Sequence, residues 1–168
     1  MPRQIKSREY FRIINLIYFA QLSALVLLAV VAYFLIKQGN LGPEDNSLAV
    51  TFQKIIIIII PVSLGAGYFL FRIFLRSITP EMPLAHKMKK YFSANIIRSA
   101  FLEVPGLFVS VAAIITAHKL FLLIVPLLLV IFILFRPTRS VIAQELNLSV
   151  AERARLEDPE AIISESIE

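Results

Sequence analysis

The chain contains no cysteine, and only two of its 168 residues are histidine. Without cysteine it has no disulfide, no thiolate metal site and no haem attachment through cysteine. His86 and His118 fall in different loops of the expected structure, which excludes a histidine-rich metal site or di-haem site within one chain. We therefore expect no metal and no cofactor.

Charge is also scarce, since 17% of the residues are charged and 58% are hydrophobic. Average soluble domains have about 25% charged and about 45–50% apolar residues, so neither a soluble globular domain nor a disordered chain fits. The net charge of +5 would suggest nucleic acid in a soluble protein. Here the basic residues flank apolar runs instead of forming a stripe on a polar helix, so we expect no nucleic-acid partner.

Long hydrophobic runs are what the sequence has instead. A membrane-spanning helix needs about 20 apolar residues, and four runs in so short a chain leave no surface that would dissolve them. The third and fourth runs together exceed one bilayer thickness, so a turn is expected at the polar break of residues 117–119. The sequence predicts an all-α, polytopic membrane protein with four transmembrane helices, at about residues 13–36, 55–75, 95–117 and 119–136.

The basic residues predict an orientation. Fourteen of the 17 Lys and Arg residues lie in the N-terminal arm, in the loop after the second run, or in the tail. The remaining three are Lys37, Lys54 and Lys119. Because cytoplasmic loops carry the excess of Lys and Arg, we expect both termini in the cytoplasm and the chain in a bacterial inner (plasma) membrane. The first run is too long for a signal peptide and no small-residue cleavage site follows it, so we expect it to stay uncleaved.

Residues 1–136 form the expected transmembrane domain, and residues 137–168 form a cytoplasmic tail. Val141, Ile142, Leu146 and Leu148 give the tail an apolar side suited to a membrane surface. The pattern from Ser149 to Glu152 is a capping box, which opens a short helix. From Glu157 onward the tail has five acids and no base, so we expect this end to be disordered.

A faint internal repeat links the two halves. An aromatic pair enters the first and third runs (Tyr10-Phe11 and Tyr91-Phe92), and the second and fourth runs contain Pro61 and Pro126. These matches suggest two duplicated helical hairpins in parallel orientation. Two unrelated hairpins that obey the same membrane-interface rules are the alternative.

Glu103 is the one acid inside an expected span, about 17 Å beyond the interfacial pair Tyr91-Phe92 and thus near the midplane. Charges at that depth are costly and usually face the interior of a helix bundle. One interpretation is a proton or ion relay, and the other is a structural carboxyl held by polar neighbours. The neighbours we assign to it are Gln21, Asn15, Ser99 and Arg98.

The third run also carries helix-packing features. Pro105 cannot donate a hydrogen bond to the carbonyl of Phe101, which frees one acceptor, and Gly106 allows another helix to approach. Small and polar residues recur along one face, so we place this helix at the centre of the bundle and expect the fourth run to face lipid. The residues assigned to packing or kinks are Pro105, Gly106, Ser110, Pro61 and Gly67.

Three lysines in the loop after the second run are candidates for lipid head-group contact. They are Lys87, Lys89 and Lys90. The alternative is that they only anchor the topology at the anionic leaflet.

Two resemblances follow from these motifs. The segment Phe-Leu-Glu103-Val-Pro-Gly resembles the carboxylate helix of ATP-synthase c-subunit proteolipids, which implies a proton-carrying role for Glu103. The glycine repeat and the polar-loop Arg-Gln-Pro of that family are missing here, and this chain has two extra spans. The whole chain also resembles small uncharacterised bacterial four-helix inner-membrane proteins, through Glu103-Val-Pro-Gly and Phe-Arg136-Pro-Thr-Arg139, which implies a fold and no activity.

Three functions remain open. The first is a non-enzymatic helical subunit or homo-oligomer, whose partners are membrane lipids and a second membrane protein or a copy of itself. The alternative is a proton- or ion-coupled transporter or channel component that uses Glu103. A membrane-embedded enzyme acting on lipid comes last, because Glu103 has no acidic partner in the membrane and neither histidine is near it in sequence. We assign no catalytic residue.

Overall fold

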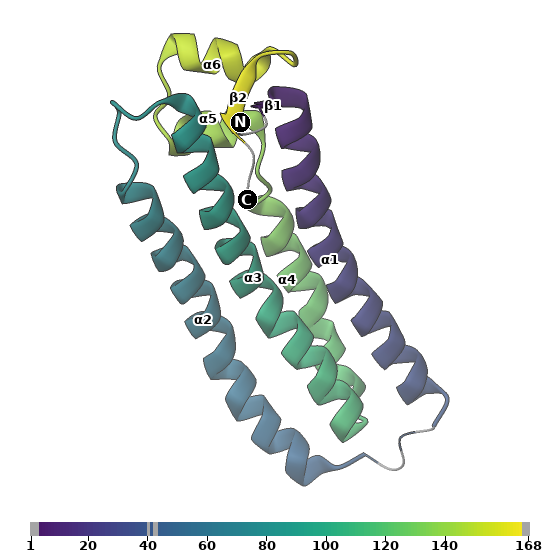
Figure 1. Cartoon of the computed structure of the whole chain (residues 1–168). Helices are drawn as coiled ribbons and strands as arrows, with labels where there is room; N and C mark the ends of the chain where they lie inside the picture. The colour runs from purple at the N-terminus through teal and green to yellow at the C-terminus, as the bar shows by residue number, and fades with distance from the viewer. Residues whose placement is uncertain (1–3, 40, 42–43, 166–168) are drawn as a thin grey trace. The chain divides into compact units, whose positions relative to one another are not determined.

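A computed structural model describes residues 4–39, 41 and 44–165 of the chain. Most of these residues are helical, which confirms the all-α prediction. In chain order, the elements are β1 (Gln4–Lys6), α1 (Ser7–Lys37), α2 (Asn46–Arg76), α3 (Leu84–Thr116), the 3-10 helix η1 (Lys119–Leu123), α4 (Ile124–Leu134), α5 (Arg139–Glu145), α6 (Val150–Glu157) and β2 (Ile162–Glu165) (Figure 1).

Three helices, α1, α2 and α3, are long and apolar enough to cross a membrane. They have 31, 31 and 33 residues, or about 46–50 Å at 1.5 Å per residue, against about 30 Å of bilayer hydrocarbon. Each begins earlier than its expected span. A helix satisfies its own backbone hydrogen bonds, so it can extend beyond the hydrophobic run into the polar sequence that precedes it.

The turn expected at residues 117–119 is confirmed. Helix α3 ends at Thr116, and Ala117 takes a left-handed conformation with φ 54°. The Thr116 hydroxyl donates to the carbonyl of Ala112 at 2.8 Å and accepts from the amide of His118 at 3.3 Å. The stretch expected as a fourth span then divides into η1 and the 11-residue helix α4. Duplication of the hairpin stays a prediction, because the expected counterpart of the 31-residue α2 is not one helix but η1 and the 11-residue α4.

Helix α3 is the most buried of the long helices, as its small-and-polar face predicts. In the most apolar 18-residue stretch of α3, 50% is buried, against 11% in the corresponding stretch of α1 and 22% in that of α2. Its predicted face is buried at Asn95, Ser99, Gly106, Ser110, Ala113 and Ala117. Glu103 lies on the same face but is only partly buried.

The chain divides into two compact units, and each long helix contributes to both. Residues 19–67 and 99–135 form one of them, which we call the apolar unit. Its core includes Leu25 of α1, Ile56 of α2 and Val109 of α3. Helix α4 buries Val125, Leu128 and Phe132, while Leu127, Val130 and Ile133 are exposed. Its other side therefore presents apolar residues outward, and contact of this side with lipid stays a prediction.

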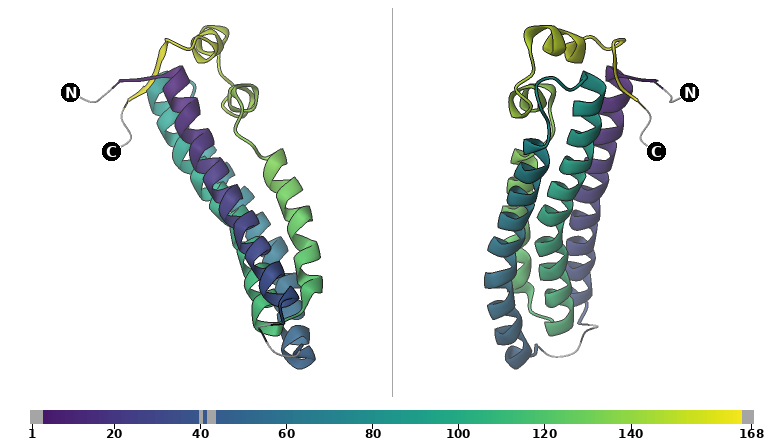
Figure 2. Two further views of the ribbon diagram at one scale, coloured as in Figure 1. Left: turned by 90° about the vertical axis from the view of Figure 1, so that its right-hand side faces the viewer. Right: turned by 60° about the vertical axis from the view of Figure 1, so that its left-hand side comes forward.

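Residues 1–18, 68–98 and 136–168 form the second unit, which we call the cap unit. Its core contains Tyr10, Phe71, Met88, Tyr91 and Ile142, all almost fully buried. Figure 2 shows β1 and β2 side by side, and they pair antiparallel with Ile5 opposite Ser164. Beside the strands, the Ser7 hydroxyl donates to the carbonyl of Leu156 at 2.7 Å, so the start of α1 is tied to the tail.

The structure changes two predictions for the tail. Ile142 and Leu148 are buried in the core of the cap unit and do not lie on a membrane surface. The acidic end is not disordered as far as Glu165, because β2 pairs with β1 and buries Ile163. Its partner lies at the opposite end of the sequence, so local composition gives no sign of it. Residues 166–168, which share the disorder prediction, lie outside the described residues.

Candidate functional site

Glu103 and Gln21 form a polar pair inside the apolar unit. Glu103 is only partly buried, and the next residue of α3, Val104, is 45% exposed. The side chain of Gln21 in α1 hydrogen-bonds the carboxyl group of Glu103. Of this pair, Gln21 Oε1 is buried and has no hydrogen-bond partner among the described residues. Within the described residues, the pair therefore lacks one hydrogen-bond donor.

Two of the other predicted neighbours, Asn15 and Arg98, have hydrogen-bond partners of their own in the structure. Asn15 belongs to the cap unit, where its Nδ2 donates to the carbonyl of Phe11 at 2.7 Å and its Oδ1 accepts from Arg136 Nε at 3.3 Å. Ser99 is buried one helical turn before Glu103. Among the described residues Glu103 forms no ion pair. Of the four expected neighbours, Gln21 is the one whose hydrogen bond to Glu103 the structure shows.

Arg98 has a partner that sequence reasoning missed. It is 4% exposed, and its Nη1 donates to Glu145 Oε1 of α5 at 2.8 Å. Its Nη2 donates to Asn95 Oδ1 at 2.8 Å, and its guanidinium lies 3.9 Å from the ring centroid of Phe71. The Tyr91 hydroxyl donates to Glu145 Oε2 at 2.6 Å. We call Phe71, Tyr91, Asn95, Arg98 and Glu145 the Arg98 cluster.

The Arg98 cluster explains why the expected Arg98–Glu103 pair does not form. Glu103 is five residues further along α3, off the i,i+4 face, whereas Glu145 accepts from both Arg98 and Tyr91. A buried guanidinium needs a carboxylate and further hydrogen bonds to offset its desolvation. The signal in the sequence was the basic residue at the edge of an apolar run. Nothing local pointed to a glutamate 47 residues away.

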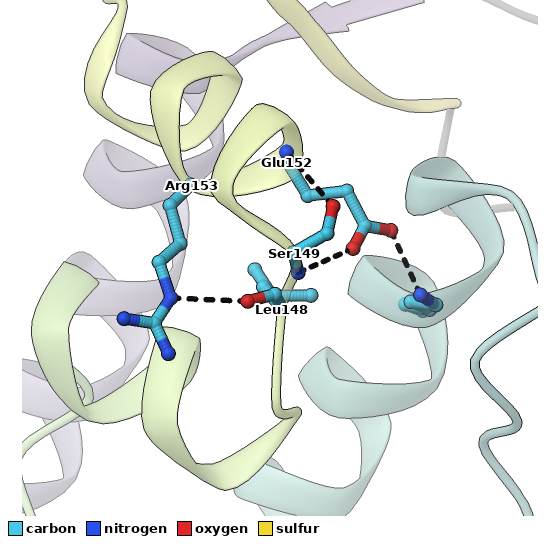
Figure 3. A network of polar contacts seen from close by, with 5 residues as sticks. Leu148, Ser149, Glu152 and Arg153 are labelled. Atoms are coloured by element: carbon cyan, nitrogen blue, oxygen red, sulfur yellow. Dashed lines mark hydrogen bonds and ion pairs between the residues drawn. The ribbon is translucent and has the colours of Figure 1, made fainter.

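Lys87 is likewise corrected from a lipid-facing to a buried residue. It is 3% exposed, and its Nζ lies 2.8 Å from Glu152 Oε1 at the start of α6. Glu152 also accepts from the Ser149 amide at 2.9 Å, while the Ser149 hydroxyl accepts from the Glu152 amide at 3.3 Å (Figure 3). The predicted capping box is therefore confirmed. Lys87 of α3 binds the Glu152 carboxylate of this capping box, so this lysine is not available to lipid head groups.

The pKa of Glu152 reflects this arrangement. Partial burial by itself would raise the pKa, because it disfavours the charged form. The hydrogen bonds from Lys87 and from Ser149, with the positive charge of Lys87, act in the opposite direction and prevail. The pKa of Glu152 is therefore below the ordinary glutamate value of 4.5, and the carboxylate is charged at neutral pH.

The Pro105 region shows how the helices of the apolar unit approach each other. The Ser63 hydroxyl of α2 donates at 2.7 Å to the carbonyl of Phe101, the acceptor that Pro105 leaves free. A Cβ at Gly106 would overlap the side chain of Leu25 in α1, so any larger residue requires Leu25 to move. Small residues of this kind let helices approach closely. Ser110 donates to the carbonyl of Gly106 at 2.9 Å. Gly67 is buried on α2, and Pro61 is exposed inside that helix.

The part of the chain that the structure describes holds no group of three or more His, Asp or Glu side chains suited to a metal ion. No protein-family model matches the sequence, and neither a curated protein nor a solved structure matches it. The two resemblances drawn from the sequence therefore stay predictions.

Proposed function

We propose that this protein is a non-enzymatic, helical subunit of a membrane assembly, made either with copies of itself or with another membrane protein. The observation that carries the proposal is the incomplete cover of Glu103. This carboxyl lies in the apolar part of α3, is only partly buried, and has a neighbour, Gln21 Oε1, that lacks a donor. In a bilayer, polar groups at such depth face protein and are paired there. A helix from a second chain, laid against this side of α3, supplies the missing cover.

The same proposal includes four spans with both termini in the cytoplasm of a bacterium. Lys119–Leu134 serves as the fourth span. It reaches the length and apolar composition of the other spans only together with α5, from which it is bent by 71°. With a rise of about 2.0 Å per residue in η1 and 1.5 Å in α4, the segment is about 27 Å long. That length is just short of the bilayer hydrocarbon, and Lys119 and Arg136 at its ends extend to the interfaces. The exposed apolar residues of α1 and α2 then contact lipid.

Recovery of a tagged chain from mild detergent tests the association. We expect the tagged protein to bring down an untagged copy or one defined membrane protein, and Val104→Trp to abolish this recovery because the ring occupies the surface next to Glu103. Val130→Trp on α4 is the matched control, since Val130 is 55% exposed and Val104 is 45% exposed. A single monomeric species for the wild type, in detergent and after crosslinking in native membranes, would contradict the proposal.

The second candidate function is proton or ion coupling through Glu103, and the unpartnered Gln21 Oε1 favours it. A protonated carboxyl carries the donor that this oxygen lacks, whereas an ionised carboxylate has none. The carboxyl is also not fixed by a cation, since Arg98 pairs with Glu145. Proton flux into liposomes containing the purified protein, compared between wild type and a folded Glu103→Gln variant, decides this point. Equal flux in the two samples eliminates the candidate.

A further inference from the structure

A surface recess lies in the cap unit between the end of α2 and the first turns of α3. It has a volume of about 510 Å³ and is lined by Phe74, Ser77, Ala85, His86, Lys89, Lys90 and Ser93. We call it the Lys89 recess. His86, Lys89, Lys90 and Ser93 follow the 3–4 spacing of one helix face, so α3 presents four polar side chains to the same space. The described residues that line the recess include no acidic side chain.

The two lysines are arranged differently in the recess. Lys90 Nζ donates to the carbonyl of Ser77 at 2.9 Å and lies 3.3 Å from the Ser77 hydroxyl, so the residue that follows α2 holds its position. An ammonium group has three donors, which leaves Lys90 one for a ligand. The side chain of Lys89 is exposed at the mouth. The O–H groups of Ser77 and Ser93 donate to the carbonyls of Phe74 and Lys89, at 2.7 and 3.5 Å. The donors left for a ligand are therefore the two lysine ammonium groups and the imidazole of His86, which suit an anion with several acceptor oxygens.

We propose that the Lys89 recess binds a phosphate group. Its wall is not purely polar, because Phe74 lines it. Phe69 and Ile73 are exposed on the preceding turns of α2 and extend the apolar surface back along this helix. A phospholipid fits both parts, with the phosphate against the lysines and an acyl chain along α2. A free phosphate or phosphate monoester fits the polar part alone. Lys87 has no part in this site, because it is paired with Glu152.

Native mass spectrometry of the full-length protein in detergent tests the proposal. The probes are dioctanoyl phosphatidylglycerol and inorganic phosphate, each titrated separately. We expect one equivalent of probe to bind and the combined Lys89→Gln and Lys90→Gln variant to bind about 10- to 30-fold more weakly, at roughly 1 kcal/mol per basic residue. The control is Arg8→Gln with Arg12→Gln, which removes the same charge from exposed positions of α1 outside the recess and is expected to bind within about twofold of wild type.

The two probes distinguish the source of the phosphate. Competition by inorganic phosphate against the lipid indicates a site for the free anion, and binding of the lipid alone indicates a head-group site. Binding by the lysine variant within twofold of wild type overturns the proposal, as does an equal loss in the arginine control. Far-UV circular dichroism shows that both variants are folded, and Lys89→Glu serves as a single-site variant if the double change perturbs the helix.

Discussion

The hydroxyl of Ser63 donates to the carbonyl of Phe101 at 2.7 Å, joining α2 to α3 at the one carbonyl that Pro105 leaves without a backbone donor. The sequence predicts the free acceptor, and the structure shows what satisfies it. A proline inside a membrane span is tolerated when a neighbouring hydroxyl pairs the carbonyl that it frees. Here Ser63 of α2 provides that hydroxyl for α3.

Removing this hydroxyl should weaken the apolar unit. We expect Ser63→Ala to lower the free energy of unfolding by about 1 kcal/mol, a typical value for a hydrogen bond between membrane helices. In a Pro105→Ala background the backbone amide of residue 105 pairs Phe101 again, so Ser63→Ala should cost clearly less. Unfolding in mixed SDS micelles, followed by circular dichroism, measures both steps. Equal costs in the two backgrounds would show that Ser63 does not act through this carbonyl.

Gly106 should resist enlargement because α1 lies directly against it. A Cβ at this position overlaps Leu25, which is fully buried and has little room to move. We expect Gly106→Ala to destabilise the protein by about 1–3 kcal/mol, the usual cost of overpacking. Shortening the opposing side chain with Leu25→Val should recover part of this loss. Gly65, where an added Cβ meets nothing within 4 Å, is the control position for the same substitution.

The Arg98–Glu145 ion pair should matter far more than the exposed Lys6–Glu160 pair. Glu145→Ala leaves Arg98 buried without its carboxylate, and we expect a loss of about 3 kcal/mol, near the lower end for a broken buried pair because Glu145 is 25% exposed. Glu160→Ala removes a pair whose side chains are 56% and 66% exposed, and should change the stability little, because water screens an exposed ion pair. Similar losses in the two variants would contradict the structural role of the Arg98 cluster.

Stability should fall in acid partly through Glu152. Its pKa is lowered in the folded protein, so the unfolded chain takes up this proton more readily. The stabilisation is therefore complete above the ordinary value of 4.5 and is lost as the pH falls through the folded pKa. We expect Glu152→Gln to flatten the acid side of a plot of unfolding free energy against pH. Glu81, whose pKa is also lowered, stabilises the folded protein in the same pH range. An unchanged slope in Glu152→Gln would show that the loss of stability in acid comes from Glu81 or another group and not from Glu152.

Local pattern accounts for the features that the sequence predicts correctly. The three apolar helices, the break after Thr116 and the capping box at Ser149 each depend on residues within a few positions of one another. The buried face of α3 also follows from its spacing, and its exposed side leaves Glu103 only partly covered.

Partners distant in sequence are what the patterns do not specify. Arg98 requires a carboxylate, but whether Glu103 or Glu145 supplies it depends on how α5 packs, and α5 is separated from it by most of α3 and all of α4. Lys87 looks like a head-group ligand until α6 places Glu152 beside it. The acidic end reads as disordered because its pairing strand is at Gln4–Lys6. In each case a tertiary contact determines which of two structural roles the residue or segment has.

Photo-crosslinking in native membranes tests the central claim most directly, namely that a second chain covers the exposed side of Glu103. A benzoylphenylalanine in place of Val104 and, separately, in place of Val130 samples two exposed valines on α3 and α4. We expect one discrete adduct from position 104, with the mass of two copies or of one further membrane protein, and only lipid adducts from position 130. Lipid adducts alone at position 104 would contradict the account.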